Sequence, residues 1–193
     1  MHANGLRCPL RRCAAYALNG YYLALVPTLM QQNLASGTLI ASLAVSILPA
    51  TSAVGQSFTH SRGHATIERT GLACLVTGAV AATAAVVGAS IVGFLGATVA
   101  LGVGHGLTTS SSLTALHAAV PPHRSAEIIA GYFACGYLAS AVPILGVGWL
   151  GDHVGLTSAG VVFFGIVALL AVGCGIVLRS PDHQVTDGRA RSR

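Results

Sequence analysis

The sequence predicts an all-α membrane protein with six transmembrane helices, arranged as two inverted three-helix repeats. Three observations predict this fold class: the 193-residue chain is 53% hydrophobic, only 8% of it is charged, and the charges cluster between long uncharged runs. A soluble domain has about 25% charged residues. A chain so poor in charge cannot cover an aqueous surface, which argues against a soluble enzyme, a disordered tail or a nucleic-acid-binding domain.

The first uncharged run predicts two helices. No Asp, Glu, Lys or Arg occurs from Cys13 to Ser61. One crossing of a bilayer takes about 20 apolar residues at 1.5 Å each, so the run is long enough for two crossings. A polar, turn-like break within Gln31–Gly37 divides it into predicted helices at 13–34 and 37–57.

Four further helices follow from the same reasoning. A second uncharged run, from Thr70 to His123, is divided by a Gly88-Ala-Ser90 break, and two more apolar runs come after it. None of these segments has the polar face of a soluble helix or the alternation of a barrel strand. The predicted helices are 70–87, 91–119, 127–150 and 156–178.

The arginines predict the orientation of the chain. All ten basic residues are Arg, and they lie before the first helix, between the second and third, between the fourth and fifth, and after the sixth. By the positive-inside rule, segment 1–12 and a disordered tail at 179–193 are both cytoplasmic. The absence of Lys beside abundant Ala and Gly indicates a GC-rich bacterial genome, which would place the protein in the plasma (inner) membrane.

Small residues and prolines predict how the helices pack. Gly102 and Gly106 have the spacing that lets two membrane helices approach closely, and Pro27 lies where it would kink the first helix. The second and fifth helices echo one another, with a proline followed by a glycine in corresponding places, at Pro49 and Pro143. Because each unit has three helices, the second would be inserted upside down, as in transporter folds. The five cysteines lack metal-type spacing, so no disulfide, metal or cofactor is expected.

Several segments resemble the major facilitator superfamily, and specifically the C-terminal half of a twelve-helix member. The loop between helices ten and eleven is resembled by Pro121-Pro122-His123-Arg124-Ser125-Ala126-Glu127. Helix eleven is resembled by the helix that follows, as far as Gly148. The segment Asn19–Pro27 is similar to the seventh helix. Gly148-Trp-Leu-Gly-Asp152-His153-Val-Gly155 resembles the family's Gly-x-x-x-Asp-basic-x-Gly signature, whereas Gly55–Arg69 keeps only basic residues and a glycine.

This resemblance implies a non-enzymatic function, the transport of a small solute by alternating access. It also implies that the chain is half of a transporter, because family members are roughly twice as long. The chain would then be a truncated or split product that pairs with a second six-helix half or with another copy of itself. A non-functional remnant is the alternative.

Five polar residues are candidates for contact with the solute. His105, Thr109 and Ser112 are spaced i, i+4 and i+7, so they share one face of the fourth helix. The resembled fold lines its cavity with the first and fourth helices of each half, which adds Asn19 and Tyr22 of the first helix. The alternative for Ser and Thr is a hydrogen bond to their own or a neighbouring helix.

Charged residues at helix ends are candidates for gating. Arg124 and Glu127 lie at the cytoplasmic start of the fifth helix, where a carboxylate is also favoured by the helix dipole alone. Asp152 lies at the outer end of the same helix. No carboxylate is predicted to lie mid-membrane, which leaves His105 as the titratable candidate for proton coupling.

An intramembrane hydrolase is the alternative from another class. Such an enzyme pairs a serine with a histidine, and Gly-x-Ser motifs end at Ser57 and Ser90. Both lie at helix ends, however, and no buried histidine is positioned by the sequence to serve them. The segment Gly146–Gly151 spells the dinucleotide fingerprint, but it ends a membrane helix and follows no strand.

Overall fold

The computed structural model describes residues 16–33, 37–61, 63–121, 123 and 125–179, and all regular structure within them is helical. The all-α prediction is therefore confirmed. Residues 16–24 form a first helical stretch. The elements that follow it are α2 (Val26–Asn33), α3 (Thr38–Ser57), the short 3-10 helix η1 (Phe58–Ser61), α4 (His64–Val87), α5 (Ile91–Ala119), α6 (Ser125–Val154) and α7 (Leu156–Arg179).

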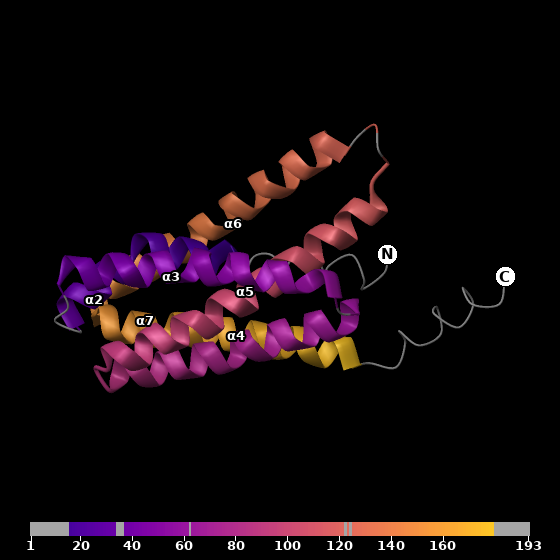
Figure 1. The fold of residues 1–193 in the computed structure, drawn as a ribbon. Coiled ribbons are helices and arrows are strands. Elements are labelled where there is room, and N and C mark those ends of the chain that lie inside the picture. Colours follow the sequence, from indigo (N-terminus) through magenta and orange to yellow (C-terminus); the bar gives the residue numbers. More distant parts are fainter. Residues whose placement is uncertain (1–15, 34–36, 62, 122, 124, 180–193) are drawn as a thin grey trace.

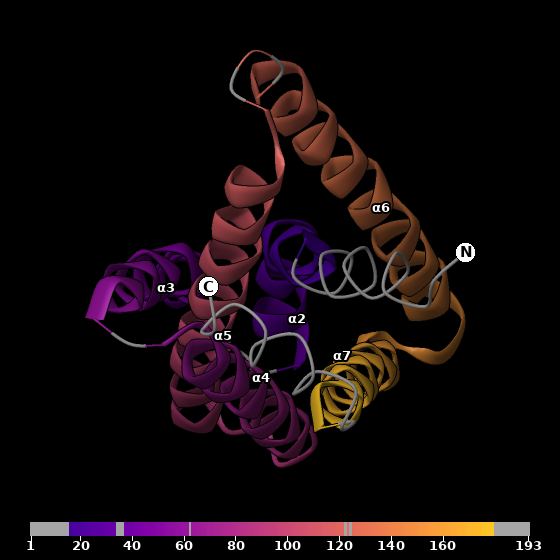
Figure 2. The ribbon, with the colours of Figure 1, turned by 90° about the vertical axis from the view of Figure 1, so that its right-hand side faces the viewer.

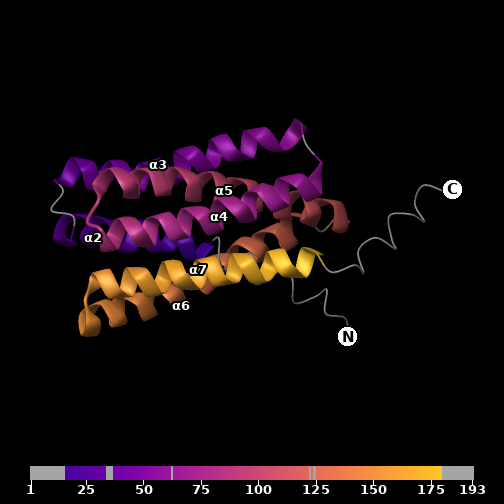
Figure 3. The same ribbon diagram turned by 90° about the horizontal axis from the view of Figure 1, so that it is seen from below.

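Successive helices run back and forth through the molecule (Figure 1). The α3–α4 and α5–α6 connections lie at one end, and the α4–α5 and α6–α7 connections lie at the other, as Figure 3 also shows. Viewed from one end, α2 lies among the other helices, while α6 forms one outer side (Figure 2). Within the described residues, five helices are long and apolar enough to cross a membrane: Thr38–Ser57, Thr66–Val87, Ile91–Thr114, Ser125–Val154 and Leu156–Ile176.

The first predicted helix is interrupted. Leu25 forms a turn between residues 16–24 and α2, although its N–H donates to the carbonyl of Tyr21 and its own carbonyl accepts from Leu29, both at 2.9 Å. Pro27 follows the turn, and its ring nitrogen has no hydrogen to donate to the preceding turn of helix. The two pieces therefore continue one path with a weakened joint at the position expected for a proline kink.

Two adjacent tyrosines anchor this first path to different neighbours. The ring of Tyr21 stacks on Phe163 of α7, with centroids 4.0 Å apart. The ring of Tyr22 stacks on Phe94 of α5 at 6.1 Å, and its hydroxyl makes a 2.9 Å hydrogen bond with Thr98 Oγ1. Both tyrosines are 1% exposed. The first path is thereby fixed between α5 and α7 by aromatic packing.

Glycines bring the backbone of α5 into contact with α3. A Cβ atom built at Gly102 would lie 2.7 Å from the carbonyl oxygen of Leu48, and one at Gly106 would overlap the carbonyl oxygen of Ser52. Real Cβ atoms essentially never come within 3.0 Å of another heavy atom. The close approach predicted from the spacing of Gly102 and Gly106 is confirmed.

A second set of glycines brings α5 equally close to α4. A Cβ at Gly104 would lie 2.8 Å from the backbone nitrogen of Leu75 and 2.9 Å from the carbonyl oxygen of Gly71. On α4, a Cβ at Gly78 would lie 2.9 Å from the backbone nitrogen of Leu101. Helix α5 is therefore in backbone contact with a neighbour on two of its sides.

Two helices extend beyond the predicted bounds. The expected third helix, 70–87, begins at His64 in the structure, and the expected fifth, 127–150, spans Ser125–Val154. Charged residues suggested loops at these places. A charged side chain near a helix end does not stop the helix, however, because the side chain can reach the surface or be buried against a partner.

The glycines of the predicted internal echo differ in their surroundings. A Cβ at Gly55 would lie 2.8 Å from the Val103 carbonyl oxygen, while Gly148 has nothing within 4 Å.

The glycine contact can be tested with two substitutions in α5. We expect Gly106→Ala to lower the free energy of unfolding by about 1–3 kcal/mol, because its new methyl group overlaps the Ser52 carbonyl. Gly96→Ala is the control, since nothing lies within 4 Å of that position, and it should leave stability unchanged or raise it by up to about 1 kcal/mol. Unfolding in SDS followed by circular dichroism measures both. Equal effects of the two substitutions would contradict the contact.

Candidate functional site

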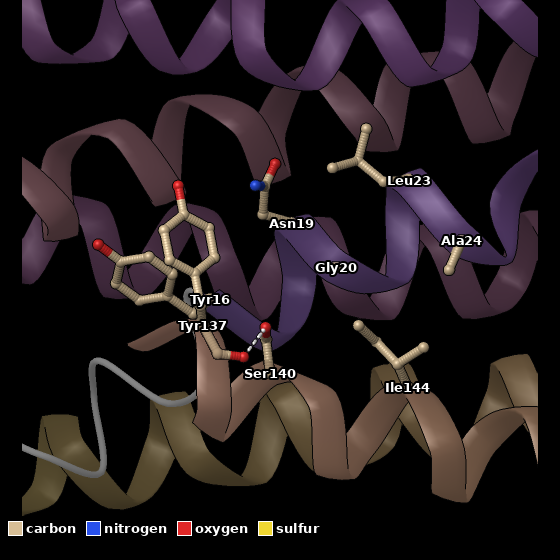
Figure 4. Close-up of a pocket in the computed structure, with 8 residues that line it drawn as sticks. All are labelled: Tyr16, Asn19, Gly20, Leu23, Ala24, Tyr137, Ser140 and Ile144. Atoms are coloured by element: carbon tan, nitrogen blue, oxygen red, sulfur yellow. Dashed lines mark hydrogen bonds between the residues drawn. The ribbon is translucent and has the colours of Figure 1, made fainter. Parts of the chain in front are cut away.

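A hollow of about 400 Å³ lies between the first helical path and α6 (Figure 4). This volume falls within the range of about 300–1,000 Å³ typical of small-molecule sites. Of the five predicted cavity residues, it contains Asn19 alone. The hollow is lined by Tyr16, Asn19, Gly20, Leu23, Ala24, Tyr137, Ser140 and Ile144.

The two walls of the hollow touch at two glycines. A Cβ at Gly20 would overlap the Ile144 side chain and lie 3.5 Å from Cβ of Ser140. A Cβ at Gly136 would lie 2.7 Å from the ring of Tyr16. Each missing side chain thus makes room for a residue of the opposite helix that lines the hollow. The hydroxyl of Ser140 donates to the Tyr137 carbonyl at 2.7 Å, which orients it within the wall.

Aromatic rings form one end of the hollow. The ring of Tyr16 packs edge-to-face with those of Tyr132, Phe133 and Tyr137, at centroid distances of 6.2, 6.4 and 5.6 Å. Such aromatic pairs contribute about 0.5–1.5 kcal/mol each beyond their buried area. Tyr132 is buried, whereas Tyr137 is 64% exposed. Three neighbours therefore hold Tyr16 in place, and Tyr137 keeps much of its ring accessible.

The predicted histidine binds a neighbouring helix. Nδ1 of His105 lies 2.9 Å from Oγ of Ser52 in α3, and Nε2 of Gln56 donates to the same oxygen at 3.4 Å. Ser52 is only 4% exposed. A second bond, of 3.1 Å, joins Thr59 of η1 to Ser110 of α5. His105 therefore belongs to a polar seam that ties α3 to α5, and it does not line the hollow.

The other predicted residues of α5 have different surroundings. The hydroxyl of Ser112 donates to the Thr108 carbonyl of its own helix at 2.8 Å, which is the alternative anticipated for serine and threonine. The hydroxyl oxygen of Thr109 is buried and has no hydrogen-bond partner among the described residues. Tyr22, expected beside the cavity, instead lies in the packed interior, bound to Thr98. These residues share one region of the molecule without forming one pocket.

The gating candidates are separated by the length of α6. Glu127 lies in the first turn of α6 and is exposed, while Asp152 is exposed near its last turn, beside His153. Nδ1 of His153 donates to the Trp149 carbonyl at 2.8 Å, so that histidine is held by its own helix. Arg124 lies outside the described residues. Glu127 and Asp152 cannot form one gate within this chain.

Glu68 is a buried carboxylate that the sequence reasoning missed. It is 6% exposed and lies within the membrane-length helix Thr66–Val87, where no carboxylate was expected. Its signal was the spacing 68–71–75–78, because Gly71, Leu75 and Gly78 all contact α5. Ionisable groups within membrane spans are rare and usually face the protein interior. Glu68 therefore extends the α5-facing stripe of α4.

The serines weighed for a hydrolase have structural roles. Ser57 donates to the Ala53 carbonyl at 3.1 Å, and Ser90 accepts the Gly93 amide at 3.1 Å as the N-cap of α5. Neither pairs with a histidine in the part of the chain that the structure describes. The Ser52–His105 pair is enclosed between two helices, where the backbone carbonyl of Ser52 rests against Gly106.

The polar seam can be tested by a double-mutant cycle. Ser52→Ala and His105→Ala should be coupled by about 0.6 kcal/mol, and by no more than about 1.7 kcal/mol, as for other hydrogen bonds between membrane helices. Ser42→Ala in α3 is the matched control, because its hydroxyl bonds only to the Thr38 carbonyl of its own helix. SDS unfolding of the single and double variants measures the coupling. Additive Ser52 and His105 effects would refute the bond.

The whole chain was compared with families and with curated proteins. A family model described as Major Facilitator Superfamily matches residues 12–192. No curated protein matches the chain. The match covers nearly all of the sequence and all of the helices described above, and the fold is that of an all-α membrane protein. The chain therefore belongs to the Major Facilitator Superfamily.

Proposed function

We propose that the chain is a six-helix half of a transporter, which moves a small solute by alternating access when it pairs with a second half. Family membership carries the general function, transport across a membrane. The hollow between the first helical path and α6 supports the finer statement. It has the volume of a small-molecule site and presents the polar Asn19 beside apolar and aromatic side chains.

Both walls of the hollow contain a proline. The first path is interrupted at Leu25, before Pro27, and α6 contains Pro143 next to the lining residue Ile144. Helices bend at such positions because a backbone hydrogen bond is missing. Bending at these two joints would change the width of the hollow at one end relative to the other. Alternating access requires a movement of this kind.

The polar residues then divide into two roles. Asn19 would contact the solute from this half. The hydroxyl oxygen of Thr109 is buried and has no partner among the described residues, so it would reach the solute only after a movement that exposes this part of α5. His105, Tyr22 and Ser112 would hold α5 in place through the bonds described above. A second six-helix chain or another copy of this one would complete the cavity.

We further propose that both ends of the chain are cytoplasmic, in the plasma membrane of a bacterium. Arg69 lies in the first turns of α4 and Arg179 ends α7, and helix alternation puts these positions at the same end of the bundle (Figure 1). Placing an arginine at the centre of a membrane span costs about 2.5–3.5 kcal/mol, so arginines stay outside the spans. By the positive-inside rule, the end of the bundle that contains them would be cytoplasmic. Glu127 at this end and Asp152 at the other would act in gating, together with Arg124, which precedes α6 in the sequence.

Two glycines test the orientation. Gly37 and Gly63 are both exposed N-cap residues with nothing within 4 Å, so cysteine fits at either. In a variant without native cysteines, Gly37→Cys should react with a membrane-impermeant maleimide in intact cells. Gly63→Cys should react only after permeabilisation. The reverse pattern, or labelling of both in intact cells, would overturn the orientation.

Transport is tested in liposomes that contain the chain together with a six-helix partner. Uptake of a panel of radiolabelled solutes identifies one that the wild-type pair moves. Asn19→Ala should slow its uptake by about 5- to 150-fold, because leaving a buried polar group of the solute without a partner costs about 1–3 kcal/mol. Ser42→Ala, on an exposed part of α3, is the control and should keep the wild-type rate.

Two other results would count against the proposal. A wild-type rate for Asn19→Ala would remove this residue from the solute site. No uptake of any solute, with every partner tried and with a correctly inserted chain, would favour the non-functional remnant.

A further inference from the structure

The lining of the hollow carries no charged side chain. Its eight residues are apolar or aromatic apart from Asn19 and Ser140, with the hydroxyls of Tyr16 and Tyr137 at one end. The acidic residues among the described positions are Glu68, Glu127 and Asp152, and none of them lines it. A charged solute that enters the hollow would therefore lose its hydration and would meet no opposite charge from this half.

Aromatic rings alone do not compensate for that loss. A cation over a tyrosine ring is attracted by the ring quadrupole, but removing a full charge from water costs far more than such contacts return. An anion would meet the same cost, and the negative faces of the rings would repel it. The composition of the hollow therefore favours a solute without net charge.

The arrangement of the rings favours a flat solute group. Tyr16 and Tyr137 lie next to one another at one end of the hollow (Figure 4), with centroids 5.6 Å apart. Tyr137 is 64% exposed, so an additional ring can pack against it. Aromatic groups pair edge-to-face or offset at such distances, and an aliphatic group of the same size gains no quadrupole term.

Asn19 supplies the polar contact. Within the described part of the chain, its side-chain amide has no hydrogen-bond partner, so it offers both a donor and an acceptor to a solute. Ser140 donates its hydrogen to the Tyr137 carbonyl, which leaves its oxygen as an acceptor. A neutral amide or hydroxyl group on the solute fits these partners.

We propose that the hollow binds a neutral amphipathic solute by its aromatic ring, which packs against Tyr16 and Tyr137, and by a polar group bound to Asn19. This assignment rests on the proposed transport function for its biological meaning, because it names the substrate class of the same site. Binding itself needs neither the second half nor transport. The two proposals can therefore fail separately.

Four small probes test the substrate class. The purified chain in lipid nanodiscs is dialysed against tritiated 2-naphthamide, with empty nanodiscs as the blank for partition into lipid. The comparators are decalin-2-carboxamide, 2-naphthoate and 2-naphthyltrimethylammonium, which remove the aromatic ring, add a negative charge or add a positive charge. The naphthamide should bind saturably, with a dissociation constant at least tenfold below that of each comparator. Equal binding of the decalin amide would show an unselective apolar groove, such as one for lipid tails, and would overturn the proposal.

Matched variants locate the binding to the hollow. Tyr137→Leu keeps apolar bulk but removes the ring, and should weaken naphthamide binding about fivefold. Trp149→Leu is the control, because Trp149 lies on the same helix, is 63% exposed and does not line the hollow. Gly136→Ala should weaken binding by displacing the Tyr16 ring, whereas Gly131→Ala, with nothing within 4 Å, should not. Wild-type affinity in Tyr137→Leu would overturn the assignment.

Transport experiments separate this proposal from the proposed function. If naphthamide binds with the expected pattern while no partner supports transport, the substrate-class assignment stands and the transport proposal fails. If the paired chains transport a solute whose uptake naphthamide does not inhibit, and naphthamide does not bind, the assignment fails and the transport proposal stands.

Discussion

The close contact of α5 with α3 and α4 is the interaction on which the remaining structure depends. In lipid, no hydrophobic driving force favours the association of two helices. Their attraction therefore comes from dense packing and from hydrogen bonds between them. Gly102 and Gly106 let α5 touch the backbone of α3, and Gly104 lets it touch α4. The Ser52–His105 bond crosses the first of these contacts. A rigid three-helix unit results, and the first helical path packs against it.

The candidate site follows from how that first path is held. Tyr21 and Tyr22 fix it to α7 and α5, on sides where the packing is dense. On its remaining side it meets α6 mainly at Gly20 and Gly136, and side chains between these contacts do not fill the space. The hollow thus lies where two proline-containing helices meet, and the first of them also packs on the closely packed helices α3 and α5. In the transport function proposed above, this frame would support the walls of the hollow while they move.

The charged residues show both the strength and the limit of the sequence. Every arginine lies outside the predicted spans because its transfer into lipid is costly. In the structure, Arg69 lies in the first turns of α4 and Arg179 ends α7, so both are close to helix ends. The same reasoning misplaced Glu68, which it assigned to a connection. In the structure α4 begins at His64, and Glu68 is a buried residue of that helix. Hydropathy finds where lipid excludes charge, but it cannot tell a loop from a helix end covered by another helix.

The sequence alone determined the helical class and the close approach at Gly102 and Gly106, since these depend on local apolar length and on residue size. It also singled out Asn19, one of the residues that line the hollow. Tertiary structure decided that His105 and Tyr22 bind other helices, and that Tyr16 and Tyr137, which no pattern in the sequence relates, lie together at one end of the hollow. Periodicity shows which residues share a face of one helix. Which neighbour that face meets depends on how all the helices rotate and cross, and this is fixed by contacts between residues far apart in the chain.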